Sequence, residues 1–269
     1  VKGCNYMIFL QHEKGWDNML TKTRQKEILK LLENRGSVTL QELKDHLNTS
    51  ESTIRRDLNT LDAQGKLVKV FGGAVAADNM SIRDEQVSRR EEKNLEEKRL
   101  IARYAASLIQ DDDFVYLDAG TTTGCMLDYI SDTTTAVFVT NAPSHAQKLA
   151  RKGMEVILIG GRLKQSTEAV VGEEACRQIE KFNFSLGFLG SNGVSERSGF
   201  STPDQDEAMV KKRAIERIHR CFVLCDHTKF YKVSPISFAK LEDAVVLTDS
   251  APQGNFQEMP NIVEISEDE

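Results

Sequence analysis

The chain has 269 residues, 40% of them hydrophobic and 28% charged, and its formal net charge is -6. This composition is typical of a soluble globular protein, and the length predicts about two domains. No apolar run approaches the roughly 20 residues that cross a bilayer, which argues against a transmembrane span.

Two further features of the composition bear on location and organisation. Five cysteines without a C-x-x-C pair argue against a disulfide framework and a thiolate zinc site, and they favour a reducing cytoplasm. Residues 19–75 carry 10 Lys and Arg against 7 Asp and Glu, a net charge of +3, whereas residues 76–269 carry 23 against 32, a net charge of -9. A small basic part joined to a larger acidic part indicates an anion-binding domain on a body with a different task.

The first segment, residues 1–18, has features of a leader that is not native to the protein. Residues 14–16, Lys-Gly-Trp, must be encoded by AAR-GGN-UGG, a purine-rich stretch that resembles a bacterial ribosome-binding site shortly before Met19. The apolar patch at residues 6–10 is too short for the core of a signal peptide. We therefore expect Met19 to be the natural start; the alternative is a genuine N-terminal arm.

Two helices are expected next. Over residues 23–35 the apolar side chains form a helical stripe that stops at Gly36. Thr39 and Glu42 are spaced as in a capping box, in which each side chain binds a free backbone amide at a helix start. This spacing predicts a second helix with one apolar face, formed by Leu40, Leu43 and Leu47.

A third helix is predicted from Ser50, with Ile54, Leu58 and Leu61 on its inward face. Its outward face carries short hydroxyls and two guanidinium groups, which are the groups that contact phosphates and guanine edges in the major groove. After Gly65 the chain alternates apolar and basic residues and then turns at paired glycines, which predicts a two-stranded wing.

Adjacent arginines are usually only a solvated helix face, but the helix-turn-helix-wing order and the positive charge favour DNA binding. The expected DNA-binding residues are Ser50, Glu51, Ser52, Thr53, Arg55, Arg56, Lys66 and Lys69.

Beyond Asp113 the chain contains six short runs of β-branched and aromatic residues, each followed at once by small or polar residues. The runs are 114–117, 136–139, 156–159, 186–189, 222–224 and 245–247, and helical stretches separate most of them. This alternation predicts an α/β domain with a doubly wound, largely parallel, Rossmann-like sheet. In such folds ligands bind at the carboxyl ends of the strands.

The segment 118–123, Asp-Ala-Gly-Thr-Thr-Thr, is the clearest candidate for a binding site. Its glycine allows close approach of the backbone, its hydroxyls can donate, and a helix beginning near Gly124 would offer free amides, so a phosphate is the expected ligand. The alternative is a simple N-cap. Lys211 and Lys229 could add positive charge or could be solvated. The five histidines show no metal-ligand spacing, so we expect no metal site and assign none of them catalysis. We also expect no cofactor.

On these residues the chain resembles the DeoR family of bacterial repressors. The string S-x-x-T-I-R-R-D-L at 50–58 and the closing Val-Phe-Gly-Gly-Ala at 70–74 resemble its DNA-binding domain, although the family usually has His where this chain has Phe71. The Gly-Thr-Thr-Thr loop and the later polar clusters resemble its effector domain. The resemblance implies a fold similar to sugar-phosphate isomerases that senses phosphorylated sugars instead of converting them.

The resemblance also implies which residues surround the sugar phosphate and which sugar it is. The implied effector-binding residues are Asp118, Gly120, Thr121, Thr122, Thr123, Asn141, Arg162, Lys211 and Lys229. Residues 91–108 and 202–207 are most similar to fructose-operon repressors of Gram-positive bacteria, whose effector is fructose 1-phosphate. A related lactose-system repressor senses tagatose 6-phosphate on a similar scaffold.

We therefore expect a cytoplasmic, non-enzymatic repressor of a sugar-utilisation operon that binds double-stranded operator DNA and a phosphorylated sugar, without a membrane partner. A single winged helix-turn-helix domain contacts few base pairs, so we expect a homo-oligomer, either a dimer or a tetramer. One alternative is a sugar-phosphate isomerase fused to a DNA-binding domain, with Asp118, Glu207 or Asp226 as its acid or base. Another is an architectural DNA-binding protein without a ligand, which leaves the Gly-Thr-Thr-Thr loop unexplained.

The expected domain boundaries follow from these elements. They are a leader at 1–18, a winged helix-turn-helix domain at 19–75, a linker at 76–94, an effector domain at 95–252 and a C-terminal tail at 253–269.

Overall fold

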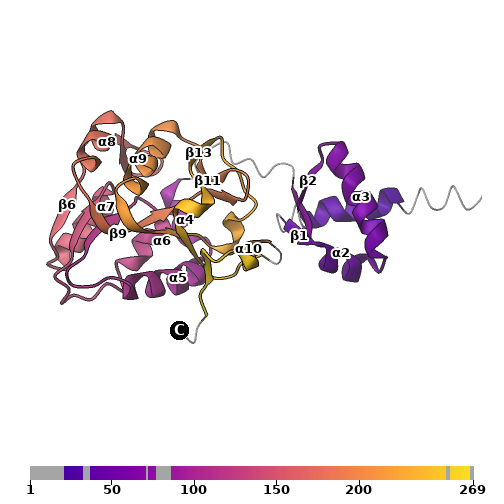
Figure 1. Cartoon of the computed structure of the whole chain (residues 1–269), viewed down its shortest axis with the longest axis horizontal. Helices are drawn as coiled ribbons and strands as arrows, with labels where there is room; N and C mark the ends of the chain where they lie inside the picture. Colours follow the sequence, from indigo (N-terminus) through magenta and orange to yellow (C-terminus); the bar gives the residue numbers. More distant parts are fainter. Residues whose placement is uncertain (1–20, 33–36, 71, 77–85, 253–254, 267–269) are drawn as a thin grey trace, which may run out of the picture. The chain divides into compact units, whose positions relative to one another are not determined.

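The chain forms two compact units, Val1–Asn79 and Met80–Glu269, each with its own core (Figure 1). The computed structural model describes residues 21–32, 37–70, 72–76, 86–252 and 255–266. The expected leader at 1–18 therefore lies outside the described residues. Within those ranges no helix is both long and apolar enough to cross a membrane.

The N-terminal unit combines helices with a small antiparallel sheet. Its elements in the described part are a helix over residues 21–32, β1 (Ser37–Thr39), α2 (Leu40–Leu47), α3 (Glu51–Ala63), β2 (Leu67–Val70) and β3 (Gly73–Ala76). Strands β2 and β3 form the expected wing, and β1 adds a third strand on the far side of β3. The third strand was not predicted, because three residues are too few for an alternating pattern to show.

Local hydrogen bonds determine where α2 and α3 begin. The Glu42 amide donates to Thr39 Oγ1 at 3.1 Å and the Thr39 amide donates to Glu42 Oε2 at 2.7 Å, so the capping box is confirmed. Ser50 caps α3 by accepting from the Thr53 amide at 3.3 Å. Between the helices Asn48 takes a left-handed conformation with φ 45°, which reverses the chain. The predicted helix-turn-helix is therefore present.

The core of the N-terminal unit contains one carboxylate. Ile54, Leu58 and Leu61 are at most 1% exposed, as their spacing predicted. Asp57, on the same helix, is also buried and forms an ion pair with the Arg24 guanidinium, while Gln25 Nε2 donates to its Oδ1 at 3.2 Å. Asp57 therefore joins α3 to the first helix by polar contacts inside the core.

Replacing Asp57 with asparagine should destabilise the N-terminal unit by about 1 to 2 kcal/mol, because hydrogen bonds to a charged group are stronger than those between neutral groups. Urea unfolding of the full chain, followed by circular dichroism, measures this change. Asp45→Ala is a suitable control, because Asp45 is exposed and accepts only from the neighbouring Gln41 in the described structure. Equal stability of D57N and wild type would contradict a structural role for the pair.

The C-terminal unit is built on a seven-stranded parallel sheet in the order β15-β14-β12-β9-β4-β5-β6. Its strands are β4 (Phe114–Leu117), β5 (Val137–Thr140), β6 (Val156–Leu158), β9 (Phe184–Gly190), β12 (Ile218–Leu224), β14 (Val245–Thr248) and β15 (Ile262–Glu264). All six predicted runs are strands of this sheet, so the doubly wound fold is confirmed. Strand β15 lies in the range expected to be a tail.

Helices cover both faces of the sheet (Figure 1). One face carries α5 (Leu95–Ser107), α6 (Thr121–Met126) and α7 (Pro143–Arg151), and the other carries α8 (Glu173–Ile179) and α9 (Gln205–Ile215). A further helix, α4 (Val87–Glu92), occupies part of the range 76–94 that was expected to be a linker. Its pattern is hidden in the sequence because none of its residues is buried.

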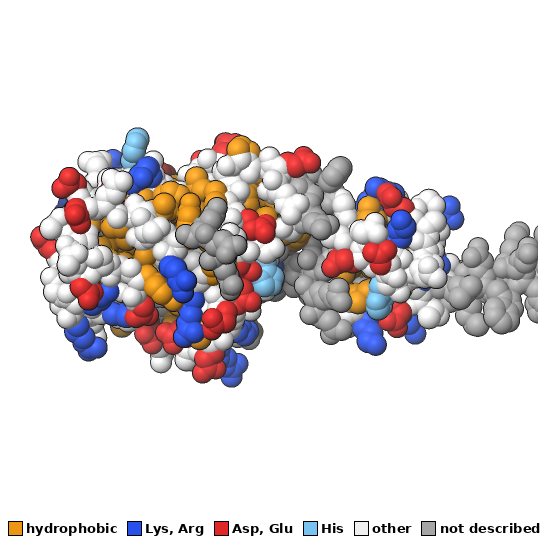
Figure 2. Space-filling model, turned by 90° about the horizontal axis from the view of Figure 1, so that it is seen from below, with side chains coloured by type: hydrophobic (Ala, Val, Ile, Leu, Met, Phe, Trp, Pro, Cys, Tyr) orange, Lys and Arg blue, Asp and Glu red, His pale blue; other side chains and the backbone are white. Residues whose placement is uncertain are grey.

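Additional short elements join the sheet and its helices. They are β7 (Arg162–Lys164), β8 (Ala169–Val171), β10 (Gly193–Ser195), β11 (Gly199–Thr202), β13 (Ile236–Ala239), α10 (Asn255–Glu258) and the 3-10 turns His227–Lys229 and Leu241–Asp243. Figure 2 shows acidic and basic side chains interspersed on the visible face of each unit, with a gathering of hydrophobic side chains on the C-terminal unit. The visible charge therefore does not single out a binding site, so the candidate sites are built from individual contacts.

Candidate functional site

The exposed surface of α3 brings six of the expected DNA-binding residues together at the start of the helix. Ser50, Glu51, Ser52, Arg55 and Arg56 are exposed, and Thr53 is half-buried. The Arg55 Nη2 lies 2.7 Å from Glu51 Oε1, so this guanidinium already has an acidic partner one turn away. The Arg56 guanidinium has no hydrogen bond or ion pair within the described residues. Within this cluster, Arg56 is therefore the cation that can meet DNA without first losing a contact to another described residue.

The two wing lysines lie apart from this cluster. Lys69 Nζ donates to Asn59 Oδ1 at 2.8 Å, and its amide donates to Asp62 Oδ1 at 3.0 Å, so β2 is joined to the C-terminal half of α3. Lys66 is exposed just before β2. Because α3 has 13 residues, it is about 20 Å long. The lysines therefore suit a backbone contact away from the base pairs that the helix start would meet.

In the C-terminal unit the Gly-Thr-Thr-Thr loop has a different geometry from the predicted one. Helix α6 begins at Thr121 and not near Gly124, with Gly120 as its N-cap. Thr123 Oγ1 donates to the carbonyls of Asp118 at 2.7 Å and Gly120 at 2.8 Å, so this hydroxyl holds the loop instead of facing a ligand. Thr122 is also buried, whereas Thr121 is half-buried. Thr121 is thus the hydroxyl best placed to meet a ligand.

Asn141 supports the same loop from the end of β5. Its Oδ1 accepts from the Ala119 amide at 2.9 Å, and its Nδ2 donates to the Val170 carbonyl at 3.2 Å. The side chain is 2% exposed. Asn141 therefore positions the loop against β8, and its polar atoms are already used within the protein.

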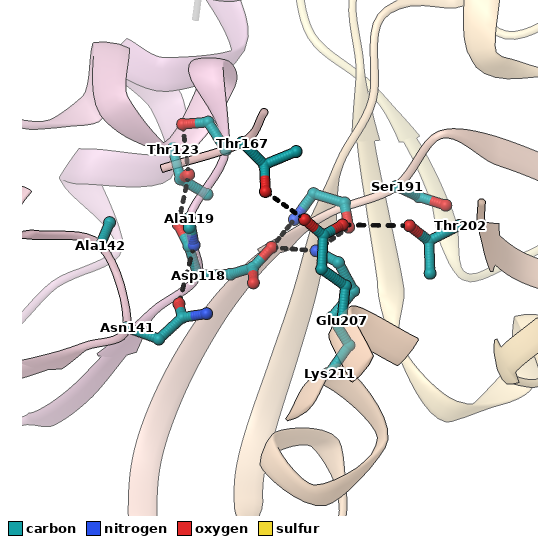
Figure 3. A network of polar contacts seen from close by, with 12 residues as sticks. Asp118, Ala119, Thr123, Asn141, Ala142, Thr167, Ser191, Thr202, Glu207 and Lys211 are labelled. Carbon is teal, nitrogen blue, oxygen red and sulfur yellow. Dashed lines mark hydrogen bonds and ion pairs between the residues drawn. The ribbon is translucent and has the colours of Figure 1, made fainter. Parts of the chain in front are cut away.

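Behind the loop, Asp118 and Lys211 form a buried ion pair (Figure 3). Asp118 follows β4 and Lys211 lies on α9. The Lys211 ammonium also donates to the Gly190 carbonyl at 3.0 Å, and the Gly190 amide donates to Asp118 Oδ2 at 3.0 Å. Both side chains are at most 7% exposed. The charge of Lys211 is therefore balanced inside the protein.

A second network surrounds Glu207, one turn before Lys211 on α9 (Figure 3). Its carboxylate accepts from the hydroxyl of Thr167 and from that of Thr202 at 3.3 Å, and it forms an ion pair with Lys164 at 3.3 Å. Arg162 lies outside this network: its side chain is 62% exposed and forms an ion pair with Asp206. The structure therefore separates Arg162 from the other expected effector residues.

The cavity beside the Gly-Thr-Thr-Thr loop has a volume of about 260 Å³. Its walls come from Gly120 and Thr121 of the loop, from Ser144, His145 and Lys148 of α7, from Thr167 and Glu168, and from α4. Gly120 and Thr121 are the residues of the expected effector set that line it. The remaining expected residues support the loop from behind or lie elsewhere.

Near this cavity lies a cationic cluster that the sequence did not reveal. Lys98 on α5 is 4% exposed, and its ammonium donates to the Arg90 carbonyl of α4. Burial lowers the pKa of Lys98, Asp226 opposes this shift, and the charges of Lys229 and Arg90 add to it. Burial disfavours the charged form of Asp226, but Lys229 and hydrogen bonds from Thr228 and Asn94 keep its pKa below the ordinary value. Arg90, which lines the cavity together with Glu91, Asp128 and Glu168, thus has a second, buried cation beside it.

One sequence signal could have identified Lys98. It belongs to the run of charged residues at 91–98, which suggests a solvated segment. Its spacing from Ile101, Ala102 and Ala105 nevertheless puts it on the buried face of α5. A lysine on an otherwise apolar helix face is therefore the feature that marks this site.

His145 forms part of the cavity wall and was not expected to have a role. It is 8% exposed, and its Nδ1 is buried without a hydrogen-bond partner in the described structure. A β-carbon at Gly124 would lie 3.0 Å from Nε2, so glycine at this position makes room for the ring. Burial lowers the pKa of His145 from 6.5 to about 4, against the opposing charge of Asp118. The ring is therefore neutral at physiological pH.

The stability of the chain should fall on acidification through His145, because protons bind its imidazole more tightly in the unfolded state. Between about pH 7.5 and about pH 5 the expected contribution is about 2 kcal/mol, lost as the pH falls below the unfolded pKa. Urea unfolding at both pH values measures it. The variant His145→Gln has no titrating ring at this position and should show the smaller difference, and an equal difference in both proteins would contradict the neutral, buried ring.

In the part of the chain that the structure describes, no group of three or more His, Cys, Asp or Glu residues is arranged to hold a metal ion. The candidate ligand site is thus defined by a cavity, a backbone loop and cationic side chains.

Comparisons with known proteins match both units. Residues 24–80 match the DeoR-like helix-turn-helix domain, and residues 93–250 match the DeoR C terminal sensor domain. The chain is 40% identical over 243 residues to the HTH-type transcriptional regulator FruR of Bacillus subtilis, covering 89% of this chain and 96% of the relative. It is 33% identical over 247 residues to the lactose phosphotransferase system repressor of Staphylococcus aureus, covering 90% and 97%.

Solved structures are similar at a lower level. Ribose 5-phosphate isomerase A of Methanocaldococcus jannaschii has a TM-score of 0.40 and 14% identity, covering 52% of this chain and 56% of that chain. A similarity of this size carries no argument about chemistry.

Proposed function

The chain belongs to the DeoR family of transcriptional regulators, and on this premise we propose that it represses a sugar-utilisation operon under the control of a phosphorylated sugar. The N-terminal unit binds operator DNA in this proposal, and the sugar phosphate binds in the cavity of the C-terminal unit. Binding of the sugar phosphate shifts the population of DNA-competent states. The protein acts in the cytoplasm.

The exposed start of α3 supports the DNA half of the proposal. Arg55 and Arg56 project from a capped helix that follows a tight turn, as in a major-groove recognition helix. The wing brings Lys66 and Lys69 toward the phosphate backbone. Because one such unit contacts few base pairs, a dimer or tetramer that reads repeated half-sites is part of the proposal.

The Arg90 guanidinium, which lines the cavity without an ion pair among the described residues, is the observation that carries the effector half. The carboxylates of Glu91, Asp128 and Glu168 line the same cavity, and next to Arg90 burial has removed much of the water that would otherwise solvate the charge of Lys98. A phosphate would balance this charge, while Gly120 and Thr121 allow close approach of its oxygens. The cavity of about 260 Å³ is slightly smaller than the roughly 300–1,000 Å³ of pockets for drug-sized ligands, which suits a small metabolite.

Fructose 1-phosphate is the effector that we propose, with tagatose 6-phosphate as the alternative. The resemblance of residues 91–108 to fructose-operon repressors supports the first, and the relative named as a lactose phosphotransferase system repressor keeps the second open. In this proposal the C-terminal unit senses the sugar phosphate and does not convert it. The candidate acid/base groups Asp118, Glu207 and Asp226 interact with Lys211, Lys164 and Lys229, and the cavity walls are formed by other residues.

Isothermal titration calorimetry of the full chain tests the effector half. Fructose 1-phosphate should bind, and fructose should bind at least about tenfold more weakly because it lacks the phosphate. The affinity for tagatose 6-phosphate, measured in the same way, shows which of the two sugar phosphates binds more tightly. An isomerase assay on the same samples separates sensing from conversion. Failure of both phosphorylated sugars to bind would overturn the proposed effector class, and turnover abolished by Asp118→Asn would favour the enzyme.

A further inference from the structure

We propose that Arg90 binds the anionic effector from helix α4, and that an occupied cavity thereby fixes α4 and acts through it on the DNA-binding unit. This inference rests on the proposed function, because it concerns the same cavity. Arg90 lies outside the Gly-Thr-Thr-Thr loop, and α4 is the element through which ligand binding would affect the DNA-binding unit.

Helix α4 is short and lies at the surface of its unit. It has six residues, none of them buried, and its N-cap residue Gln86 makes no side-chain cap hydrogen bond. Its backbone is joined to the rest of the unit through the Val87 amide, which donates to the Ser166 carbonyl at 3.2 Å, and through Lys98, which donates to the Arg90 carbonyl. A helix this short is unstable on its own, so its position depends on what it packs against.

Helix α4 also forms one wall of the cavity, through Val87, Arg90 and Glu91. The Arg90 guanidinium has no hydrogen bond or ion pair in the described part of the chain, yet it lies close enough to Lys98 for the two charges to repel. An anion in the cavity would relieve this repulsion and accept charge-assisted hydrogen bonds from Arg90. The ligand would then join α4 to Thr121 and His145, which also line the cavity.

Helix α4 follows the connection between the two units in the chain. Strand β3 of the DNA-binding unit ends at Ala76, and α4 is the first helix of the C-terminal unit in the described part of the chain. The segment that connects the two units is therefore followed in the chain by α4. Fixing α4 restricts where that segment ends, and so changes which arrangements of paired DNA-binding units are populated.

A matched pair of variants tests the binding residue. Arg89 precedes Arg90 on α4 and carries the same charge, but it is exposed and does not belong to the cavity wall. In the full chain, Arg90→Ala should weaken the affinity for fructose 1-phosphate by about 10- to 100-fold, as expected for loss of a charge-assisted hydrogen bond. Arg89→Ala should leave it within about twofold. Equal affinities in R90A and R89A would overturn the role of Arg90.

A second variant tests transmission separately from binding. Inserting Gly-Ser-Gly-Ser between Glu85 and Gln86 keeps the N-cap residue Gln86 on α4 but uncouples α4 from the preceding segment. The insertion variant should bind fructose 1-phosphate with wild-type affinity, yet its operator affinity should change less than about twofold on adding the sugar phosphate, against about tenfold or more for wild type. A full response in the insertion variant would overturn transmission through α4.

Hydrogen exchange on the wild-type chain provides an independent readout. Fructose 1-phosphate should slow exchange of the backbone amides of residues 87–92, because a fixed helix opens less often. Unchanged exchange in this segment while the ligand binds would overturn the fixing of α4. If instead neither fructose 1-phosphate nor tagatose 6-phosphate binds the wild type at all, the proposed function itself fails, and the two failures are thereby distinguished.

Discussion

Lys211→Ala should lower the free energy of unfolding of the C-terminal unit by about 3 to 5 kcal/mol. The substitution removes the cation that balances Asp118, whose side chain is 1% exposed and lies among the buried ends of β4 and β9. The carboxylate would then keep its hydrogen bond from the Gly190 amide at 3.0 Å but lose its charge partner. Urea unfolding of the full chain, monitored by far-UV circular dichroism, measures this loss of stability.

Two further variants control this prediction. Lys212→Ala removes the neighbouring, exposed lysine and should change the free energy of unfolding by no more than about 0.5 kcal/mol. The double variant Asp118→Asn, Lys211→Met removes both charges and should recover part of the stability, because an uncompensated buried charge is the main penalty. Wild-type stability of K211A would contradict the buried pair. Because of this penalty, Lys211 variants are poor probes of effector binding.

Arg55→Ala and Arg56→Ala combined should reduce the affinity for the specific operator about 100-fold or more, since each base-reading arginine contributes about 1 to 3 kcal/mol. Both side chains are exposed at the start of α3, and the Arg55–Glu51 pair is 51% and 56% exposed. An exposed pair of this kind stabilises a protein by about 1 kcal/mol at most, so the double variant should stay folded. Fluorescence anisotropy with labelled operator DNA measures the affinity.

The control for the double variant is Arg177→Ala, which removes an exposed arginine from α8 in the other unit. Its operator affinity should equal that of wild type at the same salt concentration. The single variants rank the two arginines, and we expect the larger loss for Arg56, whose guanidinium has no competing partner in the described structure. Specific binding by the double variant at wild-type strength would contradict α3 as the recognition helix.

Local signals predicted much of this fold, because the chemistry of those residues acts over a few positions. The Thr39–Glu42 capping box and the Ser50 cap each join residues three apart, so their spacing identifies the helix starts. The apolar runs of the inner strands are largely buried on both faces, which makes them visible as continuous apolar segments, whereas Ile157 and Leu158 of the edge strand β6 are exposed. Strand β15 has only partly buried or exposed residues, so its signal in the sequence is weak.

The candidate site was harder to predict, because burial and pairing depend on segments far apart in the chain. Lys98 and His145 gain their properties from elements that pack around them. Arg162 follows a predicted strand end, but Gly161 at φ 149° turns the chain into β7 and directs the arginine to Asp206 on α9. Thr123 was expected to face the ligand, yet two carbonyls of its own loop accept its hydroxyl.

The most direct test of control by a sugar phosphate is the operator affinity of the full chain with and without fructose 1-phosphate, measured by anisotropy at fixed salt. We expect a change of about tenfold or more, and no comparable change with unphosphorylated fructose. Identical operator affinity with saturating fructose 1-phosphate and without it, in a sample that binds the compound by calorimetry, would show that this sugar phosphate does not control DNA binding.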